Sequence, residues 1–457
     1  MIPIRLLETL QTYPATGAYW LAYSGGRDSH VLLHLLAGLG ARLPARLTAV
    51  HINHGLQPEA DDWDAHCRTV CGELQVPFES IALRLSPVPG KSLEALARNA
   101  RYQALTDLMN SGDVLLTAHH QGDQAETILL QLLRGAGPAG LSAMPGLTAL
   151  DPGYLGRPLL GVSTEALASY AALHRLQWIE DVSNLDERFD RNFLRSRVIP
   201  VLRQRWPALS RTLSRSASHC GEAQSLVERV ADDGLARLMD KTTASLAIPG
   251  LSELPMPEIR VILRHWIKSL GFLVPDAGRI DEMIRETTLA APDRHPLIRW
   301  PGAEVRRYRR RLFIRPPLPA FDNRTVLPWN GELPLQLPAS LGQLHAVSDT
   351  KGIMPSFWQS AAIDVRFRHK GESLRVAGRN NSRSFKKLFQ EHGVPPWLRD
   401  RIPLVYLDGK LAAIADLCTL EPFAAVHGTP GVVIRWQGHG LRELSSKQRM
   451  KPLNPGV

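Results

Sequence analysis

The chain has 457 residues, of which 44% are apolar and 21% charged; it contains four cysteines and has a net charge of +10. No run reaches the roughly 18 apolar residues of a membrane span, the first residues lack a signal-peptide pattern, and the cysteines are too few for a disulfide framework. We therefore expect about three domains in the reducing cytoplasm, with no membrane contact and with a preference for polyanionic partners.

The first part of the chain alternates strand-like and helix-like segments. Four apolar runs are typical of strands: 17–24, 47–52, 76–83 and 113–120. Between them, 92–109 spaces its apolar residues as a helix does and begins at Ser92, a candidate N-cap. This alternation predicts βαβ units and so a parallel sheet covered by helices, in a Rossmann-like α/β domain over 1–215. Ligands of such folds bind beyond the carboxyl ends of the strands.

The most informative segment is Ser24-Gly25-Gly26-Arg27-Asp28-Ser29, which follows the first predicted strand and precedes a helix. The glycines let the backbone turn tightly, so that N–H groups and two hydroxyls face an anion at a helix N-terminus. The segment is not a Walker A loop, because the trailing Gly-Lys-Ser/Thr is absent. A carboxylate repels phosphate, so Asp28 indicates a bridging Mg²⁺. The alternative is a glycine-rich turn in which Asp28 stabilises the helix dipole.

A second polar segment, 117–127, lies where the strand 113–120 ends and a helix begins. Asp123 and Glu126 are three residues apart and so share a helix face; the alternative is that both only stabilise the helix dipole. His119 and His120 do not predict a zinc site, because no cysteine pair or third ligand accompanies them at suitable spacing.

Arginines mark two further candidate segments. Arg98 and Arg101 are three apart on one predicted helix face, where arginine suits bidentate contact with a carboxylate or phosphate; a solvated face is the alternative. The polar run from Trp178 through Arg191 to Arg195 is typical of a functional loop, with helix capping as the alternative.

After residue 215 the strand signal fades. Apolar stripes over 217–240 and 254–287 predict helices, and hence a mostly helical domain over 216–318. A Pro-rich stretch then predicts a linker over 319–350.

The last part of the chain is expected to be a basic α+β domain over 351–440, followed by a tail at 441–457. Residues 405–415 predict a hairpin around Asp408-Gly409, the pair that a type I′ turn needs. Residues 384–393 predict a short helix that ends at Gly393.

Positive charge is concentrated in two places. Residues 305–315 hold six arginines and no acid, and residues 366–401 hold ten Lys or Arg against three acids. Such clusters favour a nucleic acid partner, and a solvated basic face is the alternative.

Together these segments resemble a known family. The segment 24–29 is similar to the PP-motif of the N-type ATP pyrophosphatases, which cleave ATP to AMP and pyrophosphate. Several other segments resemble the tRNA(Ile)-lysidine synthetase family in its longer bacterial form: 50–57, 97–102, 117–127, 134–145, 178–202 and 375–406. The resemblance covers most of the chain and is weakest in the middle helical part.

The resemblance implies a ligase that uses ATP and Mg²⁺, with no zinc and no iron–sulfur cluster. ATP adenylates the 2-carbonyl oxygen of the wobble cytidine in a tRNA(Ile) with a CAU anticodon. Free L-lysine then displaces AMP through its ε-amine, and the product base is lysidine. The amine must lose its proton to attack, and keeping it neutral at pH 7 costs roughly 4–5 kcal/mol.

The resemblance also implies roles for particular residues. Ser24 to Ser29 would bind ATP, with Asp28 holding Mg²⁺ through the ATP phosphates. Arg98 would neutralise phosphate or hold the lysine carboxylate. Asp123 and Glu126 would act either as the base for the lysine amine or as the groups that orient its ammonium. The residues expected to bind tRNA are Arg191, Arg195, Arg306, Arg307, Arg379, Lys386 and Lys387.

One position departs from the family pattern. Many members carry two acids where this chain has Gly122-Asp123, so that only Asp123 can act as a carboxylate here. The departure keeps open a tRNA-binding protein without catalysis. A tRNA thiolase is the other alternative, but none of the four cysteines has the Cys-x-x-Cys spacing that thiolases of the 2-thiocytidine type use for an iron–sulfur cluster. The sequence does not give the oligomeric state, and the resemblance is compatible with a homodimer.

Overall fold

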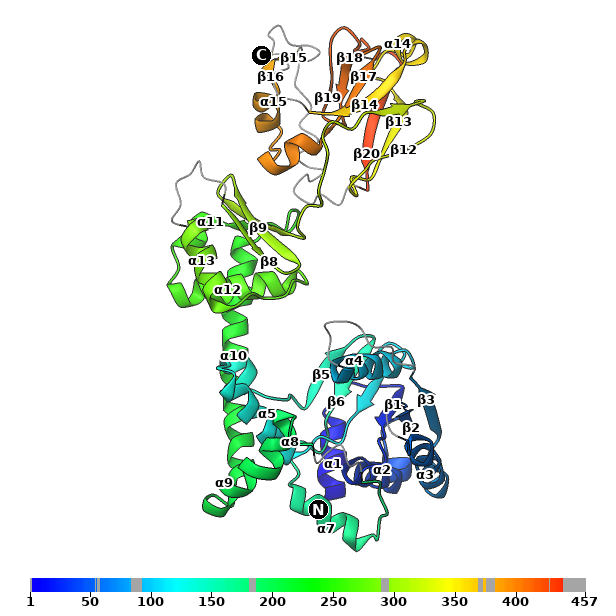
Figure 1. Ribbon diagram of the computed structural model, residues 1–457, viewed down its shortest axis with the longest axis vertical. Coiled ribbons are helices and arrows are strands. Elements are labelled where there is room, and N and C mark those ends of the chain that lie inside the picture. The colour runs from blue at the N-terminus through cyan, green and yellow to red at the C-terminus, as the bar shows by residue number, and fades with distance from the viewer. Residues whose placement is uncertain are drawn as a thin grey trace. The chain divides into compact units, whose positions relative to one another are not determined.

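The chain forms two compact units in the computed structural model, Met1–Leu226 and Val227–Val457 (Figure 1). The structure describes residues 2–53, 55, 58–83, 93–180, 186–288, 296–368, 373–374, 383–426 and 428–438. Helix α10 (Leu209–Leu238) begins in the first unit and ends in the second.

The first unit is built on a six-stranded sheet in the order β3-β2-β1-β4-β6-β5. Its strands are β1 (Ala18–Ala22), β2 (Arg46–Asn53), β3 (Phe78–Ala82), β4 (Val114–Leu116), β5 (Leu147–Leu150) and β6 (Gly153–Gly156). All neighbours are parallel except β5, which pairs antiparallel with β6 at the sheet edge. The predicted parallel sheet is confirmed, and the β5–β6 hairpin is an addition that the apolar runs did not reveal.

Helices cover both faces of this sheet (Figure 1). The helices α1 (Ile2–Gln11), α2 (Arg27–Leu39), α3 (Ala60–Glu73) and α7 (Thr164–Leu173) share one apolar core with β1 and β4. Helix α4 (Leu93–Thr106) packs on the opposite face, where Leu105 contacts the core formed by Val50 and Leu115. The expected helix at 92–109 is therefore confirmed to within a few residues.

A second group of helices continues from the sheet. It contains α5 (Gln121–Leu133), α6 (Pro138–Leu141), α8 (Asp190–Phe193), a π-helical turn η3 (Leu194–Val198) and α9 (Ile199–Arg205). A separate short 3₁₀ turn, η1 (Gly40–Arg42), follows α2. The segments α8, η3 and α9 follow one another without a break, and α5 packs against α8. This packing brings the 190–198 segment next to the end of β4.

The second unit begins with helices and a small sheet. The helices are the end of α10, α11 (Ile248–Ser252), α12 (Met256–Ser269) and α13 (Ala277–Thr288), which confirms the helical pattern. The sheet has the order β7-β10-β9-β8, from β7 (Leu246–Ala247), β8 (Leu297–Trp300), β9 (Ala303–Tyr308) and β10 (Arg311–Arg315). These strands lie in a region that was expected to be mostly helical, because six arginines hide the alternation of apolar residues around Val305 and Leu312, both of which are buried.

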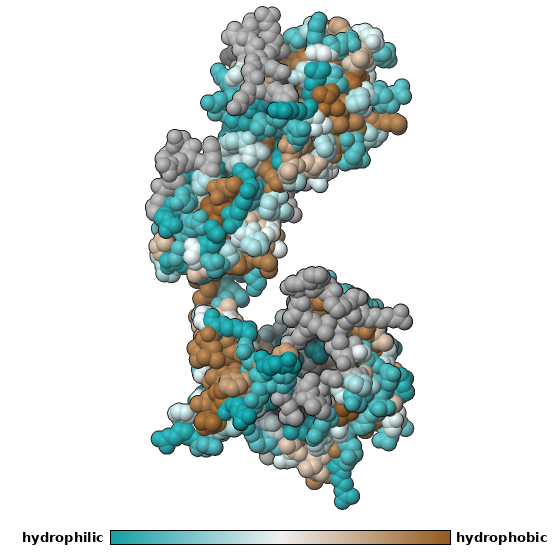
Figure 2. Space-filling view, in the orientation of Figure 1, coloured by the Kyte–Doolittle hydropathy of each residue, from teal (hydrophilic) through white to brown (hydrophobic). Residues whose placement is uncertain are grey.

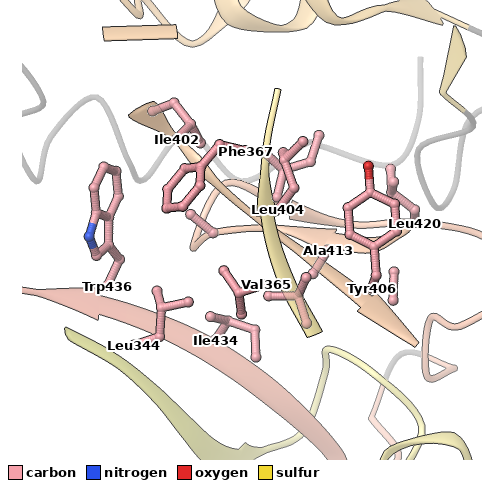
Figure 3. Close-up of a cluster of buried hydrophobic side chains, with 14 of the residues drawn as sticks. Leu344, Val365, Phe367, Ile402, Leu404, Tyr406, Ala413, Leu420, Ile434 and Trp436 are labelled. Atoms are coloured by element: carbon pink, nitrogen blue, oxygen red, sulfur yellow. The ribbon is translucent and has the colours of Figure 1, made fainter. Parts of the chain in front are cut away.

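The rest of the second unit is mostly strands. Two sheets pack together, one in the order β11-β14-β17-β18-β19 and the other β12-β13-β20. The strands are β11 (Leu327–Trp329), β12 (Leu335–Gln336), β13 (Gln343–Asp349), β14 (Ile363–Phe367), β17 (Pro403–Leu407), β18 (Lys410–Ile414), β19 (Cys418–Thr419) and β20 (Gly431–Gln437), with a separate pair β15 (Ser373–Leu374) and β16 (Arg383–Ser384). Figure 3 shows their shared core, in which Leu344 and Ile434 of one sheet meet Val365 and Leu404 of the other.

Short helices and one hairpin complete this region. The helical segments are α14 (Pro355–Ser360), α15 (Phe385–Glu391) and the 3₁₀ helix η4 (Pro396–Arg401). Helix α15 has Ser384 as its N-cap and is followed by Gly393 at φ +69°, as its sequence predicts. The hairpin β17–β18 turns at Asp408 and Gly409, both with positive φ, which confirms the predicted I′-type turn residues.

The segment 319–350 is not the linker that its proline content predicts. It supplies β11, β12 and β13, and Trp329, Leu337, Leu341 and Leu344 belong to the buried core of the two sheets. Prolines occupy the edges and turns here, where no ladder hydrogen bond is lost. The expected tail at 441–457 lies outside the described residues.

The surface of both units is largely hydrophilic in the view of Figure 2, with apolar residues gathered around α9. Val201 and Trp206 are more than half exposed there. Within the described part of the chain, no helix has both the length and the apolar character needed to cross a membrane. All four cysteines are free thiols, and Cys67 and Cys71 are buried.

Candidate active site

An open cavity of about 650 Å³ lies at the carboxyl ends of β1 and β4. This is the place where parallel α/β sheets bind their ligands. Its walls come from the loop after β1, from α4, from the β4–α5 junction, from 178–180 and from the π-helical turn. The lining residues with polar or aromatic side chains are Ser24, Arg27, Asp28, Ser29, Arg101, Tyr102, Thr117, His119, Asp123, Trp178, Glu180 and Arg195.

The loop from Ser24 to Ser29 turns sharply into α2. Gly25 has φ +80°, and a Cβ there would lie 2.5 Å from the Ile179 side chain, so that only glycine fits. The backbone carbonyl of Gly25 accepts a hydrogen bond from the N–H of Ile179 at 3.0 Å, which holds 178–180 over the loop. Gly26 provides no side-chain cap for α2. The first N–H groups of that helix therefore remain available to an anionic ligand.

Two hydroxyls and one carboxylate project from this loop. Ser24 Oγ and Ser29 Oγ lie 3.0 Å apart, and Ser29 Oγ also donates to the carbonyl of Gly26 at 2.9 Å. Asp28 is one-third exposed and is contacted by Arg27 at 3.0 Å and by His120 Nε2 at 3.3 Å. Burial by itself raises the pKa of Asp28, but the hydrogen bond from His120 and the charge of Arg27 outweigh it and lower that pKa. The carboxylate is thus kept ionised beside the helix N-terminus.

His120 connects this loop to α5. Its Nδ1 accepts the N–H of Gly122 at 2.9 Å, and the carboxylate of Asp123 accepts the N–H of His120 at 2.9 Å, so the two residues form a capping box. Burial lowers the pKa of His120, but the hydrogen bond to Asp28 and the nearby carboxylates of Asp123 and Glu126 raise it overall.

Two carboxylates and two guanidinium groups form a cluster between α5 and the segment α8–η3, and Asp123 and Arg195 of this cluster line the cavity. Glu126, which is 4% exposed, receives Arg191 Nε and Arg195 Nε, both at 2.6 Å. Asp123 receives Arg191 at 2.8 Å and Arg195 at 3.4 Å. Burial lowers the pKa of Arg195, but the hydrogen bond to Glu126 and the charges of both acids raise it. Asp123, Glu126, Arg191 and Arg195 are hereafter called the Asp–Glu–Arg cluster.

The structure brings most of the predicted catalytic residues to one cavity. The loop from Ser24 to Ser29, with Asp28, lines it together with Asp123, and Glu126 shares Arg191 and Arg195 with Asp123. Arg98 is on α4, whose residues Arg101 and Tyr102 line the cavity, but the side chain of Arg98 lies outside the described part of the chain.

The residues predicted to bind tRNA fall into different environments. Arg191 and Arg195 lie in the Asp–Glu–Arg cluster, where their side chains are 35% and 45% exposed. Lys386 and Lys387 are exposed on α15, which agrees with their expected role, and Arg379 lies outside the described residues.

Arg306 and Arg307 do not lie on an open basic surface as predicted. Arg306 pairs with the fully buried Glu304 at 2.8 Å and lies over the ring of Trp397. Arg307 is 7% exposed and donates to the carbonyl of Thr287 at 3.0 Å. The arginine run predicts a surface, but successive residues of β9, which face opposite sides of the sheet, are buried or half-buried, so both faces of the strand are covered.

Sequence reasoning missed how His119 and His120 contribute; it identified the run from Trp178 as a functional loop without predicting that 178–180 lies over the loop at Ser24–Ser29. His119 lines the cavity and its Nδ1 lies 2.9 Å from Thr117 Oγ1. The position of the two histidines at the end of β4 could have singled them out, since that end faces the ligand. Within the described ranges, no group of three or more His, Cys, Asp or Glu side chains is placed to hold a metal ion by itself.

Three family comparisons match successive parts of the chain. Residues 3–202 match the PP-loop domain, residues 246–313 the TilS substrate binding domain, and residues 363–436 the TilS substrate C-terminal domain. The first match contains the whole cavity.

Curated relatives match over nearly the full length. The tRNA(Ile)-lysidine synthase of Coxiella burnetii is 42% identical over 424 residues, which is 93% of this chain and 94% of the relative. The enzyme of the same name from Methylococcus capsulatus is 44% identical over 431 residues, 92% of this chain and 96% of the relative. Among solved structures, the U34-tRNA thiolase NcsA from Methanococcus maripaludis with its 4Fe-4S cluster is 15% identical, with a TM-score of 0.41 over 48% of this chain and 76% of that one.

Proposed function

The chain belongs to the tRNA(Ile)-lysidine synthase family, and from that premise we propose that it ligates L-lysine to the 2-position of the wobble cytidine of a tRNA(Ile) with a CAU anticodon. The reaction consumes ATP and releases AMP and pyrophosphate. Since the substrate is tRNA and the thiols are free, we expect it to work in the cytoplasm.

One observation carries the proposal: the nucleotide loop and two members of the Asp–Glu–Arg cluster, Asp123 and Arg195, line the same cavity. The reaction needs one site for ATP and another for lysine, which carries both ammonium and carboxylate groups. The loop at Ser24–Ser29 supplies N–H groups and hydroxyls for phosphate, and the cluster supplies carboxylates for ammonium. Shared access lets the adenylated cytidine meet lysine without leaving the protein.

In the adenylation half, the loop holds the β- and γ-phosphates while the 2-carbonyl oxygen of cytidine attacks the α-phosphorus. The bond between the α- and β-phosphates breaks, and pyrophosphate leaves with its electron pair. Asp28 fits a Mg²⁺ ion held jointly with phosphate oxygens, because it is an ionised carboxylate on a loop whose other groups suit phosphate. Such an ion would neutralise phosphate charge when bound.

In the ligation half, the ε-amine of lysine attacks C2 of the cytosine ring and AMP leaves. Both carboxylates of the cluster already accept arginine N–H groups at 2.6–3.4 Å. Asp123 and Glu126 are proposed either to accept the proton of the lysine amine or to orient its ammonium. Arg98 on α4 is proposed to contact phosphate or the lysine carboxylate.

The tRNA is expected to contact exposed basic residues. Lys386 and Lys387 are available on α15, and Arg379 belongs to the same basic stretch of sequence. Arg191 and Arg195 are partly exposed, Arg195 lines the cavity, and both are proposed to contact the phosphate next to the reacting base. Formation of a homodimer stays a prediction.

The proposal is tested by incorporation of labelled lysine into unmodified tRNA(Ile) with a CAU anticodon, in the presence of ATP and Mg²⁺. A methionine tRNA with the same anticodon is the control. Incorporation into the isoleucine tRNA alone, with AMP and pyrophosphate released, supports the function. AMP formation with another RNA only would indicate a different modification, and no ATP turnover would indicate a tRNA-binding protein without catalysis.

A further inference from the structure

Gly122 occupies a position where no side chain fits. A Cβ there would lie 2.6 Å from His120 Cε1 and 2.7 Å from Thr164 Oγ1, closer than real Cβ atoms approach other groups. Its φ is not positive, so backbone freedom does not require glycine at this point of α5. The position therefore needs glycine for the space it leaves, although glycine weakens a helix.

The space is occupied by the imidazole of His120. The ring is 7% exposed and makes contacts from both of its nitrogens: Nδ1 accepts the N–H of Gly122, and Nε2 lies 3.3 Å from Asp28 Oδ2. One nitrogen thus fixes the start of α5, and the other reaches the nucleotide loop. Since α5 also carries Asp123 and Glu126, the ring spans the two halves of the cavity.

A larger side chain at position 122 does not fit beside the imidazole as it stands here. Any side chain would push the ring away from Gly122 N and with it from Asp28. The departure from the family pattern thus has a structural counterpart in the position of His120.

We propose that His120 is a positioning residue that holds Asp28 of the nucleotide loop against the start of α5, and that glycine at position 122 leaves the space that this ring occupies. The inference rests on the proposed function, because it assigns the pair to the ATP side of the same reaction. It concerns the placement of Asp28 and needs no change in the protonation of the ring.

The test is a double-mutant cycle on the full-length chain. Gly122→Ala, His120→Ala and the double variant are compared for the Kd of ATP with Mg²⁺ by calorimetry. We expect each single variant to weaken binding at least 10-fold. All variants are built on Thr164→Ala, because the Cβ at 122 would also meet Thr164 Oγ1 at 2.7 Å. On that background the double variant should be no weaker than His120→Ala, because the alanine at 122 has neither the ring nor the hydroxyl left to displace. Additive losses would overturn the proposal.

Two further variants separate positioning from folding. Gly161→Ala is the matched control: it lies beside α5, has ordinary φ, and its Cβ would meet no atom within 4 Å, so ATP affinity should not change. His120→Asn can still cap α5, since asparagine is a good N-cap, but it is too short to reach Asp28. It should unfold near the wild-type temperature and still bind ATP as weakly as His120→Ala. Full recovery of ATP affinity in His120→Asn would reduce the ring to a helix cap and refute the proposal.

Kinetics of lysine incorporation supply an independent readout. The His120 variants should raise the KM for ATP and leave the KM for lysine within two-fold, and an equal rise in both would contradict the assignment. If the wild type binds ATP but forms no lysidine, the proposed function fails while the binding cycle still decides the inference. If the wild type does not bind ATP, both fail.

Discussion

Asp28 is the carboxylate of the nucleotide loop, and its replacement by asparagine tests most directly whether this charge is needed for AMP formation. Asp28→Asn keeps an oxygen that can accept from His120 but removes the charge that would face a cation and phosphates. We expect AMP formation to fall at least 100-fold, with tRNA affinity within two-fold of wild type, since the exposed lysines are elsewhere in the chain. AMP release and filter binding of tRNA measure the two effects. Undiminished AMP formation would remove Asp28 from the mechanism.

His30, on α2 behind the loop, predicts how stability depends on pH. Burial lowers the pKa of this imidazole below its ordinary 6.5, assisted by the nearby His66 and His34, although a hydrogen bond to the carbonyl of Gln177 opposes the shift. As pH falls, the unfolded chain binds a proton at this imidazole near pH 6.5, whereas the folded chain binds it only at a lower pH. The contribution of His30 to the free energy of unfolding is therefore present above pH 6.5 and is lost as pH falls through the folded pKa.

The variant His30→Gln keeps hydrogen-bonding groups at this position and cannot titrate. Its unfolding free energy, from urea titrations between pH 7.5 and 5, should depend less on pH than that of the wild type. Replacement of the exposed His219 by glutamine serves as the control and should leave the slope unchanged. Equal slopes in wild type and His30→Gln would contradict the role of His30.

Helix α5 is tied to the segment α8–η3 by the Asp–Glu–Arg cluster, so removal of Glu126 is expected to loosen two elements together. Glu126→Ala leaves Arg191 and Arg195 side by side without their main partner. Because both guanidinium groups are partly exposed, we expect a loss of about 2 kcal/mol, below the range for a fully buried pair.

The same variant should raise the KM for lysine at least 10-fold and leave the Kd of ATP within two-fold. Glu126→Gln, which keeps the shape of the side chain, should lose the charge effect and recover part of the stability. Denaturant unfolding and lysine kinetics check these outcomes. A change in ATP affinity without a change in the KM for lysine would indicate that the cluster contributes to ATP binding and not to lysine binding.

Elements with strong local signals could be predicted, and those fixed by distant contacts could not. The turn at Asp408-Gly409 and the end of α15 at Gly393 follow from residues that adopt positive φ readily, whatever surrounds them. The hairpin β9–β10 was not predicted because burial of Arg306 and Arg307 depends on the ring of Trp397 and on the carbonyl of Thr287. Partners so far from an arginine in sequence leave no periodic pattern.

The candidate site followed the same rule. The loop at Ser24–Ser29 is one continuous string, so its chemistry could be read directly. The partners of Asp123 and Glu126 come from residues about 70 positions later in the chain, and only the packing of α5 against α8 makes them neighbours. The link between His120 and Asp28 likewise crosses from one strand end to another.

For the molecule as a whole, the cavity and the exposed lysines belong to different units. All cavity-lining residues lie in the first unit, whereas Lys386 and Lys387 lie in the second. A chain that ends at Pro316 should therefore keep ATP affinity within two-fold and lose at least 10-fold in tRNA affinity. The cut belongs there and not near 350, because Trp329 and Leu344 are part of the C-terminal core.

Calorimetry with ATP and filter binding with tRNA measure these two affinities, after circular dichroism has shown that the shortened chain is folded. The full-length double variant Lys386→Ala/Lys387→Ala is the matched control. It should lower the slope of log affinity against log salt by about 1–2, because each lost phosphate contact removes about one. Unchanged tRNA affinity in the shortened chain would place the tRNA contacts in the first unit.

The π-helical turn at Leu194–Val198 has a consequence for insertions and deletions. A π turn accommodates one more residue than an α turn, as if a single residue had been inserted into a regular helix. Deleting one residue there would restore the regular winding and rotate everything that follows by about 100°. Arg195 would then leave Glu126, and the apolar side of α9 would turn with it. This stretch should therefore tolerate substitution of the exposed Ser196 but no change in its length.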